Sequence, residues 1–152
     1  MNTKTFLNAE DAKDSRRPQK RNSKEEKSLE NDFSHDIIGA AVEIQRVLGV
    51  GLLESAYASA LAVELQERGL QFEREVAVEA WYKDQPLGLA YRADFIVEGK
   101  VIVELKAIDV VSELHRAQLL SYLRVSGLKL GLLINFHSFP VVKGIHRLVN
   151  QL

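Results

Sequence analysis

The chain has 152 residues, of which 46% are hydrophobic, and this is enough for one domain with its own core. It contains no cysteine, which excludes a thiol nucleophile and a cysteine-ligated zinc site and fits a reducing compartment. Twenty basic and twenty-one acidic residues give a net charge of −1, so the chain lacks the strong positive charge of many nucleic-acid-binding proteins.

The first part of the chain differs from the rest. Residues 1–32 are rich in charge and poor in large apolar side chains, which predicts a disordered N-terminal tail. Its basic stretch, 16–24, could contact phosphate, although a solvated tail is the favoured interpretation. No segment suits a signal peptide or a membrane span, so we expect a cytoplasmic protein without membrane contact. The folded domain is expected to comprise residues 33–152.

Two helices are predicted at the start of this domain. Apolar residues at helical spacing between Ile37 and Leu48 indicate an amphipathic helix that ends at Gly49. A second helix is predicted over 53–68, and Gly69 closes it.

Five strands and one further helix are expected after these. The helix begins after Ser112, a candidate N-cap, and runs to about Val125. It separates the third strand from the fourth, so a right-handed crossover would make those two strands parallel, with the third at the centre of the sheet. This order predicts an α/β sandwich with a central mixed β-sheet flanked by helices. The strands are expected at 72–81, 87–97, 101–108, 130–135 and from 141 to about 148.

The third strand carries two charges in an otherwise apolar run. Because side chains alternate along a strand, Glu104 and Lys106 point to the same side as Ile102. Burying charge is costly unless it is paired or bound to a metal. One interpretation is a structural ion pair, or an edge strand with a solvated face. The other is a functional site.

Asp94 favours a functional site. It lies near the end of the preceding strand, and a tight turn at 98–100 would form a hairpin that brings it close to Glu104. Two adjacent carboxylates repel unless a cation lies between them, and Mg²⁺ or Mn²⁺ suits oxygen ligands. Lys106 would then orient a water molecule or stabilise negative charge. This set predicts metal-assisted hydrolysis of a phosphodiester.

The spacing of Asp94, Glu104 and Lys106 resembles the core motif of the PD-(D/E)XK nucleases, with Ala93 in place of the proline in that pattern. Residue 93 takes no part in the chemistry, so this difference does not affect the expected site. The resemblance implies a restriction-endonuclease-like fold and a divalent-metal-dependent nuclease, with DNA as the expected substrate.

Three other segments narrow the resemblance. Residues 51–57, Gly-Leu-Leu-Glu-Ser-Ala-Tyr, match the signature of the GxxExxY family within that superfamily. Residues 118–122 resemble the QxxxY motif of other members, and 131–136 resemble the family's next strand. The resemblance therefore covers essentially all of 33–152.

The resemblance also implies roles for individual residues. Asp94 and Glu104 would ligate Mg²⁺ or Mn²⁺, with the backbone carbonyl of Leu105 as a possible third ligand. Glu54 would be a further ligand or would hold a metal-bound water, although a glutamate at a helix start also complements the helix dipole. Lys106 would assist the attacking water.

Four residues are expected in supporting places. Gln118 and Tyr122 would contact the nucleic-acid backbone or support the site, and His115, on the same helical stripe, could bind phosphate or metal. The alternative is an ordinary solvated helix face. Tyr57 is expected as structural support, as a core aromatic residue.

Two rival functions are open. A nuclease fold could serve as a catalytically silent module that binds nucleic acid or a protein partner. A structural domain with a buried ion pair would have no affinity for metal.

Overall fold

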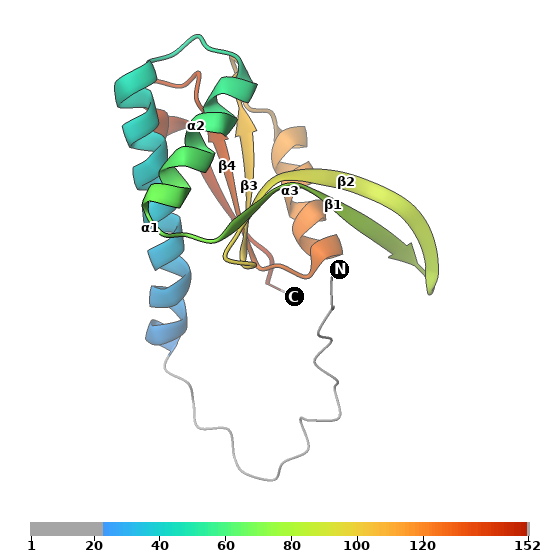
Figure 1. Cartoon of the computed structure of the whole chain (residues 1–152). Coiled ribbons are helices and arrows are strands. Elements are labelled where there is room, and N and C mark those ends of the chain that lie inside the picture. Colours follow the sequence, from blue (N-terminus) through green and yellow to red (C-terminus); the bar gives the residue numbers. More distant parts are fainter. Residues whose placement is uncertain (1–22, 152) are drawn as a thin grey trace.

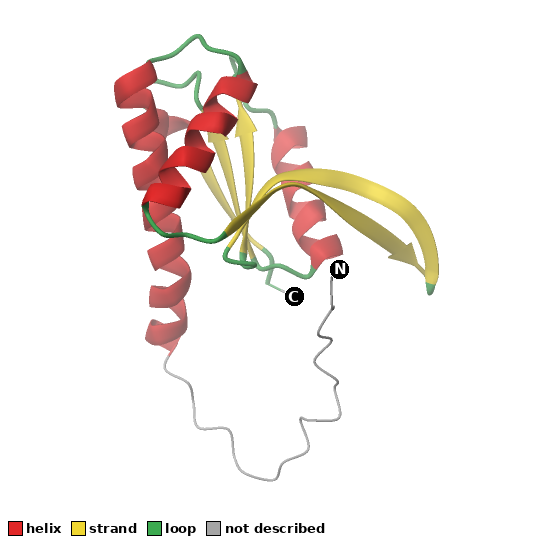
Figure 2. Cartoon of the chain, in the orientation of Figure 1, coloured by secondary structure: helices red, strands yellow, loops and turns green. Residues whose placement is uncertain are grey.

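The computed structural model describes residues 23–151, with side chains from residue 33 onward, and these form one α/β layer structure (Figures 1 and 2). None of the described helices combines the length and hydropathy needed to span a membrane. The elements in chain order are α1 (Ser23–Leu48), α2 (Glu54–Glu67), β1 (Phe72–Tyr82), β2 (Gln85–Val97), β3 (Val101–Lys106), α3 (Glu113–Ser126), β4 (Leu130–Asn135), the 3₁₀ turn η2 (Val141–Gly144) and β5 (Ile145–Val149).

The five strands form a single mixed sheet in the order β1-β2-β3-β4-β5. β3 and β4 are parallel, and the other neighbouring pairs are antiparallel. Helices α1 and α2 lie on one side of the sheet and α3 on the other (Figure 2). The predicted α/β class, the central position of β3 and the parallel crossover through α3 are therefore confirmed.

Two apolar cores lie on the two sides of the sheet, and β3 contributes to both. Val101, Val103 and Leu105 belong to the core under α1 and α2, hereafter the α1–α2 core. Ile102 belongs to the core under α3, hereafter the α3 core. The predicted alternation along β3 is confirmed, so Glu104 follows Ile102 on the α3 side.

Helix α1 begins earlier than the sequence predicted. The prediction placed the start of order near Asp32, whereas α1 starts at Ser23 and so includes the end of the segment expected to be disordered. Lysine, glutamate and leucine between these positions are good helix formers, and they extend a helix that is docked further along. Residues 1–22 of the predicted tail, with most of the basic stretch, lie outside the described residues.

The last strand begins later than predicted, at Ile145 instead of Val141. The residues before it form the turn η2, which Gln45 of α1 holds in place. The amide of Val141 donates to Gln45 Oε1 at 2.7 Å, and Gln45 Nε2 donates to the carbonyl of Ser138 at 2.7 Å. The turn ends in Gly144, where a Cβ atom would lie 2.6 Å from a backbone oxygen. A tertiary contact from α1 thus overrides local strand propensity.

The β1–β2 hairpin is much longer than the rest of the sheet. β2 pairs with β3 only over residues 95–97, while β1 and β2 pair along their whole lengths. Residues 76–92 therefore form a curved two-stranded ribbon, hereafter the arm, whose base packs against the α3 core through Val76, Val78 and Tyr91 and whose outer part projects from the body (Figure 1). Its tip is a two-residue turn, Lys83 and Asp84, both with positive φ, so the turn predicted at 83–86 is shorter than expected.

Candidate active site

The acid pair lies where β2 and β3 separate. The two strands pair at Phe95 and Val103, and Asp94 and Glu104 come next on each. The amide of Leu105 donates to Asp94 Oδ2 at 2.8 Å, and the amide of Asp94 donates to Glu104 Oε1 at 3.3 Å. The carboxylates thus accept hydrogen bonds that backbone carbonyls accept in a regular ladder. The structure brings Asp94 and Glu104 together, as the hairpin predicted.

At Asp94, β2 also changes the side of the sheet to which it contributes. Phe95 and Val97 pack in the α1–α2 core, whereas Tyr91 and Ala93 pack in the α3 core. A regular strand would place all four residues on one face. The change follows from β2 leaving β3 and bending into the arm, and it leaves Asp94 at the bend.

Electrostatics at this point favour a cation. Burial, together with the charge of Asp94, raises the pKa of Glu104 to about 8, and the nearby Lys106 opposes the rise. A divalent cation between the carboxylates would favour the ionised form of both. Their oxygens suit a hard ion such as Mg²⁺ or Mn²⁺ that keeps several waters.

The pair would need other oxygen ligands to complete a metal site. Within residues 33–151, no group of three or more His, Cys, Asp or Glu side chains is arranged to hold a metal ion. Water and backbone carbonyls would supply the rest, and ligation by the Leu105 carbonyl stays a prediction. The donor chemistry therefore fits Mg²⁺ or Mn²⁺ better than a metal that needs a full cage of side chains.

Lys106 is half-buried at the end of β3. Its positive charge opposes the rise in the pKa of Glu104 and in that of Glu54. Among the residues with described side chains, no ion pair within 4.0 Å joins Lys106 to a carboxylate. Its ammonium is therefore not held in a structural salt bridge. This counts against a site that exists only as an ion pair.

Asn135 fixes the end of β3, and its sequence context did not suggest this role. It is 1% exposed and pairs with Lys106 across the parallel ladder. Its Oδ1 accepts from the amide of Ile108 at 3.1 Å, and its Nδ2 donates to the carbonyl of Ile108 at 2.8 Å. These bonds replace ladder bonds and end the strand at Lys106, two residues earlier than predicted. The available signal was an amide residue at the end of a wholly apolar strand.

Glu54 is the first residue of α2 and follows a break at Gly51, whose φ of +98° requires glycine. Glu54 is an exposed residue, yet loss of solvent around its carboxylate raises its pKa. The charge of Asp94 adds to this rise, and that of Lys106 opposes it. Glu54 thus lies within electrostatic reach of the acid pair, but it does not complete a three-ligand cluster with it.

Tyr122 of α3 packs against the α3 core and lies within electrostatic reach of the acid pair. Burial, Glu104 and then Asp94 raise the pKa of its hydroxyl. Its ring stacks on Tyr91 of β2, with centroids 3.7 Å apart and planes 5° from parallel. The hydroxyl of Tyr91 donates to the backbone carbonyl of Tyr122 at 3.2 Å. Tyr91 was not predicted, because only the bend at Asp94 turns it toward α3.

The other predicted supporting residues lie in different settings. The Nδ1 atom of His115 accepts from the amide of Ser112 at 3.0 Å, within a capping box that starts α3. Gln118 is exposed on α3. Tyr57 is fully buried in the α1–α2 core, and its hydroxyl donates to the carbonyl of Gly49 at 2.7 Å. It holds the loop that precedes Glu54.

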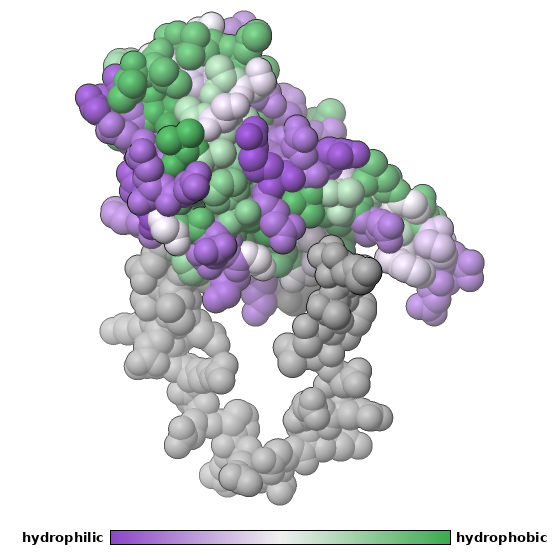
Figure 3. Space-filling model, viewed as in Figure 1, coloured by the Kyte–Doolittle hydropathy of each residue, from purple (hydrophilic) through white to green (hydrophobic). Residues whose placement is uncertain are grey.

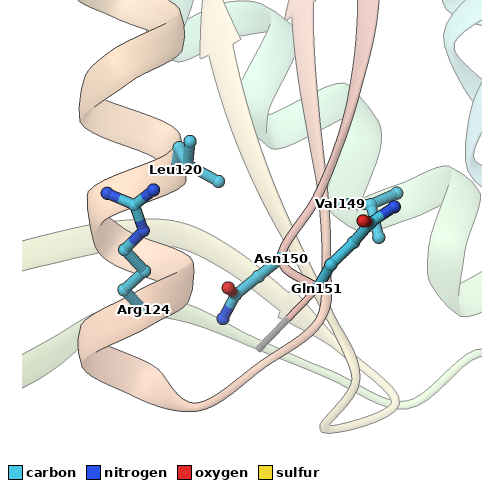
Figure 4. A pocket seen from close by; sticks show the side chains of 5 residues that line it. All are labelled: Leu120, Arg124, Val149, Asn150 and Gln151. Atoms are coloured by element: carbon cyan, nitrogen blue, oxygen red, sulfur yellow. The ribbon is translucent and has the colours of Figure 1, made fainter.

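An open groove lies elsewhere, between the C-terminal half of α3 and the end of β5 (Figure 4). It contains none of the predicted site residues. The side chains that line it are Leu120, Arg124, Val149, Asn150 and Gln151.

Comparison with known families identifies the superfamily of the chain. The family model of the PD-(D/E)XK nuclease superfamily matches residues 31–148, a span that includes the acid pair, Lys106, Glu54 and Tyr122. Comparison of the chain with curated proteins and with solved structures found no match.

Proposed function

The chain belongs to the PD-(D/E)XK nuclease superfamily, and on this premise we propose that it is a divalent-metal-dependent nuclease that hydrolyses phosphodiester bonds in DNA. The observation that carries the proposal is the pair Asp94 and Glu104 at the point where β2 and β3 separate, beside Lys106, which forms no ion pair with a carboxylate of the described side chains. Within the superfamily we place the chain with the GxxExxY proteins, on the residues Gly51, Glu54 and Tyr57.

Asp94 and Glu104 would hold Mg²⁺ or Mn²⁺, with the Leu105 carbonyl as a third ligand and Glu54 reaching the ion directly or through water. When bound, the cation supplies positive charge that polarises the phosphate and lowers the pKa of a bound water. The hydrogen bonds from the amides of Leu105 and Asp94 orient both carboxylates before any substrate arrives.

The remaining residues act on the water and the phosphate. The ammonium of Lys106 orients the attacking water and stabilises negative charge that develops on the phosphate oxygens. The hydroxyl of Tyr122 can donate to a phosphate oxygen, since a phenol is protonated at neutral pH and burial and the two carboxylates raise its pKa further. Gln118 lies one helical turn before Tyr122 on α3 and is exposed to a strand passing the site.

A second candidate is a catalytically silent module that binds nucleic acid or a protein partner. The small ligand set favours it, because within the described side chains only two carboxylates converge closely. The retention of all three motif residues favours the nuclease, as does a Lys106 that no described carboxylate holds in a salt bridge.

The test combines cleavage and metal binding. With Mg²⁺, we expect the chain to cut DNA, and Asp94→Asn and Lys106→Ala to lower the rate by at least about 10²–10³-fold. Calorimetry should show Mg²⁺ binding that a double variant, Asp94→Ala with Glu104→Ala, lacks. The matched controls are Asp36→Asn on α1 and Lys129→Ala before β4, which should retain activity.

The outcomes separate the candidates. Metal binding and DNA binding without cleavage of DNA or RNA would support the silent module and overturn the nuclease. Absence of metal binding, with and without DNA, would leave only a structural domain. Loss of folding in Asp94→Asn, seen as a lost thermal transition, would contradict a purely catalytic part for Asp94.

A further inference from the structure

The tip of the arm exposes large apolar side chains to solvent. Trp81 is 57% exposed, and Tyr82, which follows it on β1 and therefore lies on the other face of the ribbon, is 61% exposed. On β2, Leu87 and Leu89 are 62% and 57% exposed. The Nζ atom of Lys83 lies 5.4 Å from the centroid of the Tyr82 ring. Figure 3 shows the outer part of the arm projecting from the body, with hydrophobic residues along it and hydrophilic residues at its end. Exposed aromatic residues on a projecting element mark a contact surface.

The arm is electrically neutral, which limits what it can bind. Within residues 76–92, Lys83 and Arg92 are balanced by Glu79 and Asp84. Attraction of a phosphate backbone requires an excess of positive charge, and the arm has none. Stacking of an aromatic ring on a base needs no net charge, since every base has an aromatic face. If the arm contacts the substrate, it contacts bases.

The arm is continuous with the acid pair, so a substrate at one can reach the other. Trp81 pairs with Pro86, which precedes Asp94 by eight residues on β2. At about 3.3 Å per residue, the tip lies at most about 26 Å along the strand from Asp94. A stacked nucleic-acid strand covers that distance in about eight nucleotides at ~3.4 Å each. The curvature of the arm in Figure 1 shortens the direct path.

A second copy of the chain is a weaker candidate for the partner. Four side chains that are each a little more than half exposed offer roughly 500 Å², at the ~150–250 Å² of a large side chain. A stable dimer buries about 800 Å² per partner. In addition, Glu79 pairs directly with Leu89, so the apolar surface is interrupted by a charge.

We propose that the arm binds unpaired bases of the substrate by stacking on Trp81, so that the preferred substrate is DNA with a single-stranded segment within about eight nucleotides of the cut. Bases in a duplex expose only their edges, and a ring can stack on them only after a base step is opened. This inference rests on the proposed nuclease function, which supplies the substrate.

Trp81 is the only tryptophan of the chain, so its fluorescence reports on the arm alone. The full chain, in EDTA to prevent cleavage, is titrated with a single-stranded 16-mer, the matching duplex and an abasic strand of equal length. We expect quenching by the single strand, and much weaker quenching by the duplex and by the abasic strand, which carries the same phosphates. Equal responses to the single and the abasic strand, or no response, would overturn the proposal.

Variants provide a second readout through the anisotropy of a labelled single strand. Trp81→Ala is expected to weaken binding by about 5- to 100-fold, and Trp81→Phe, which keeps an aromatic face, by much less. The control is Val63→Ala, which truncates an apolar side chain of similar exposure on α2. Unchanged affinity in Trp81→Ala would overturn the proposal, and equal thermal midpoints would show that each variant is folded.

Two further outcomes distinguish this inference from the proposed function. Metal-dependent cleavage without any response of Trp81 would overturn the stacking arm and leave the nuclease intact. Quenching by the single strand without cleavage would support the arm and overturn catalysis. A fluorescence change that follows protein concentration, and not DNA, would assign the arm to a second copy and overturn the proposal.

Discussion

The two sides of the sheet bury different kinds of side chain. On the α1–α2 side, a large apolar core covers the sheet, and the buried amide of Gln45 and the hydroxyl of Tyr57 are hydrogen-bonded. On the α3 side, the apolar core gives way to Glu104, Lys106 and the stacked pair of Tyr91 and Tyr122. The first side is arranged for packing, while the second places costly polar groups together. Mutations on the two sides should therefore have opposite effects on stability and activity.

The largest effect on stability should come from the α1–α2 side. Leu61 is fully buried there, and Leu61→Ala should lower the free energy of unfolding by about 2–5 kcal/mol, because it leaves a cavity. Urea denaturation measures this. Val63→Ala, two residues along α2 and 55% exposed, should change it by less than about 0.5 kcal/mol. A loss below about 1 kcal/mol in Leu61→Ala would mean that this core is loosely packed.

On the α3 side, removing a charge should stabilise the metal-free protein. The pKa of Glu104 is about 8 in the fold against an ordinary 4.5, so between these pH values the folded state keeps a proton that the unfolded chain releases. Stability is therefore highest below pH 4.5 with respect to this group, and it falls as the pH rises toward 8. Glu104→Gln should abolish that fall and gain on the order of 2 kcal/mol at pH 8.

Thermal midpoints of the wild type and Glu104→Gln in EDTA, from pH 5 to pH 9, check this. The two curves should meet near pH 5 and diverge above it. A variant that is less stable at pH 8 would show that the carboxylate stabilises the fold. Such a result would weaken the contrast between the two sides of the sheet.

Tyr91 should affect activity more than stability. Tyr91 contacts Tyr122 and takes no part in the hydrogen bonds that join Asp94 to β3, so it acts by holding the Tyr122 ring. We expect Tyr91→Leu to lower kcat/KM for DNA about tenfold, and Tyr91→Phe, which keeps the stack, to lower it much less. Calorimetry should show unchanged Mg²⁺ affinity in both variants. Equal losses in the two variants would instead assign the effect to the hydrogen bond from the Tyr91 hydroxyl.

The smallest effect is expected at His115. His115→Ala removes the acceptor for the Ser112 amide and should cost about 1 kcal/mol of stability, with little change in cleavage. Ser112→Ala, which removes the other half of the capping box, should cost a similar amount. A tenfold loss of cleavage without loss of stability would instead support the role in binding phosphate or metal that the sequence suggested for His115.

Much of the fold could be predicted from local patterns. Periodicity located every helix and strand, and alternation in β3 placed Glu104 on the side opposite Val103. The errors at the start of β5 and at the end of β3 occur where a distant group intervenes. Gln45 holds the turn that delays β5, and Asn135 ends β3 early. Hydrogen bonds to side chains far away in the sequence leave no periodic signal.

The sequence by itself singled out Asp94, Glu104 and Lys106 as candidate site residues and predicted the hairpin that brings the two acids together, because residue type and strand spacing are local properties. Only the tertiary structure decided that β2 leaves β3 at Asp94, and three consequences follow from that separation. The carboxylates of Asp94 and Glu104 take over backbone hydrogen bonds, Tyr91 turns toward Tyr122, and the rest of the hairpin becomes a free arm with Trp81 near its tip. The physical reason is that β3 pairs with β2 over only three residues, and the point where two strands separate depends on what packs around them.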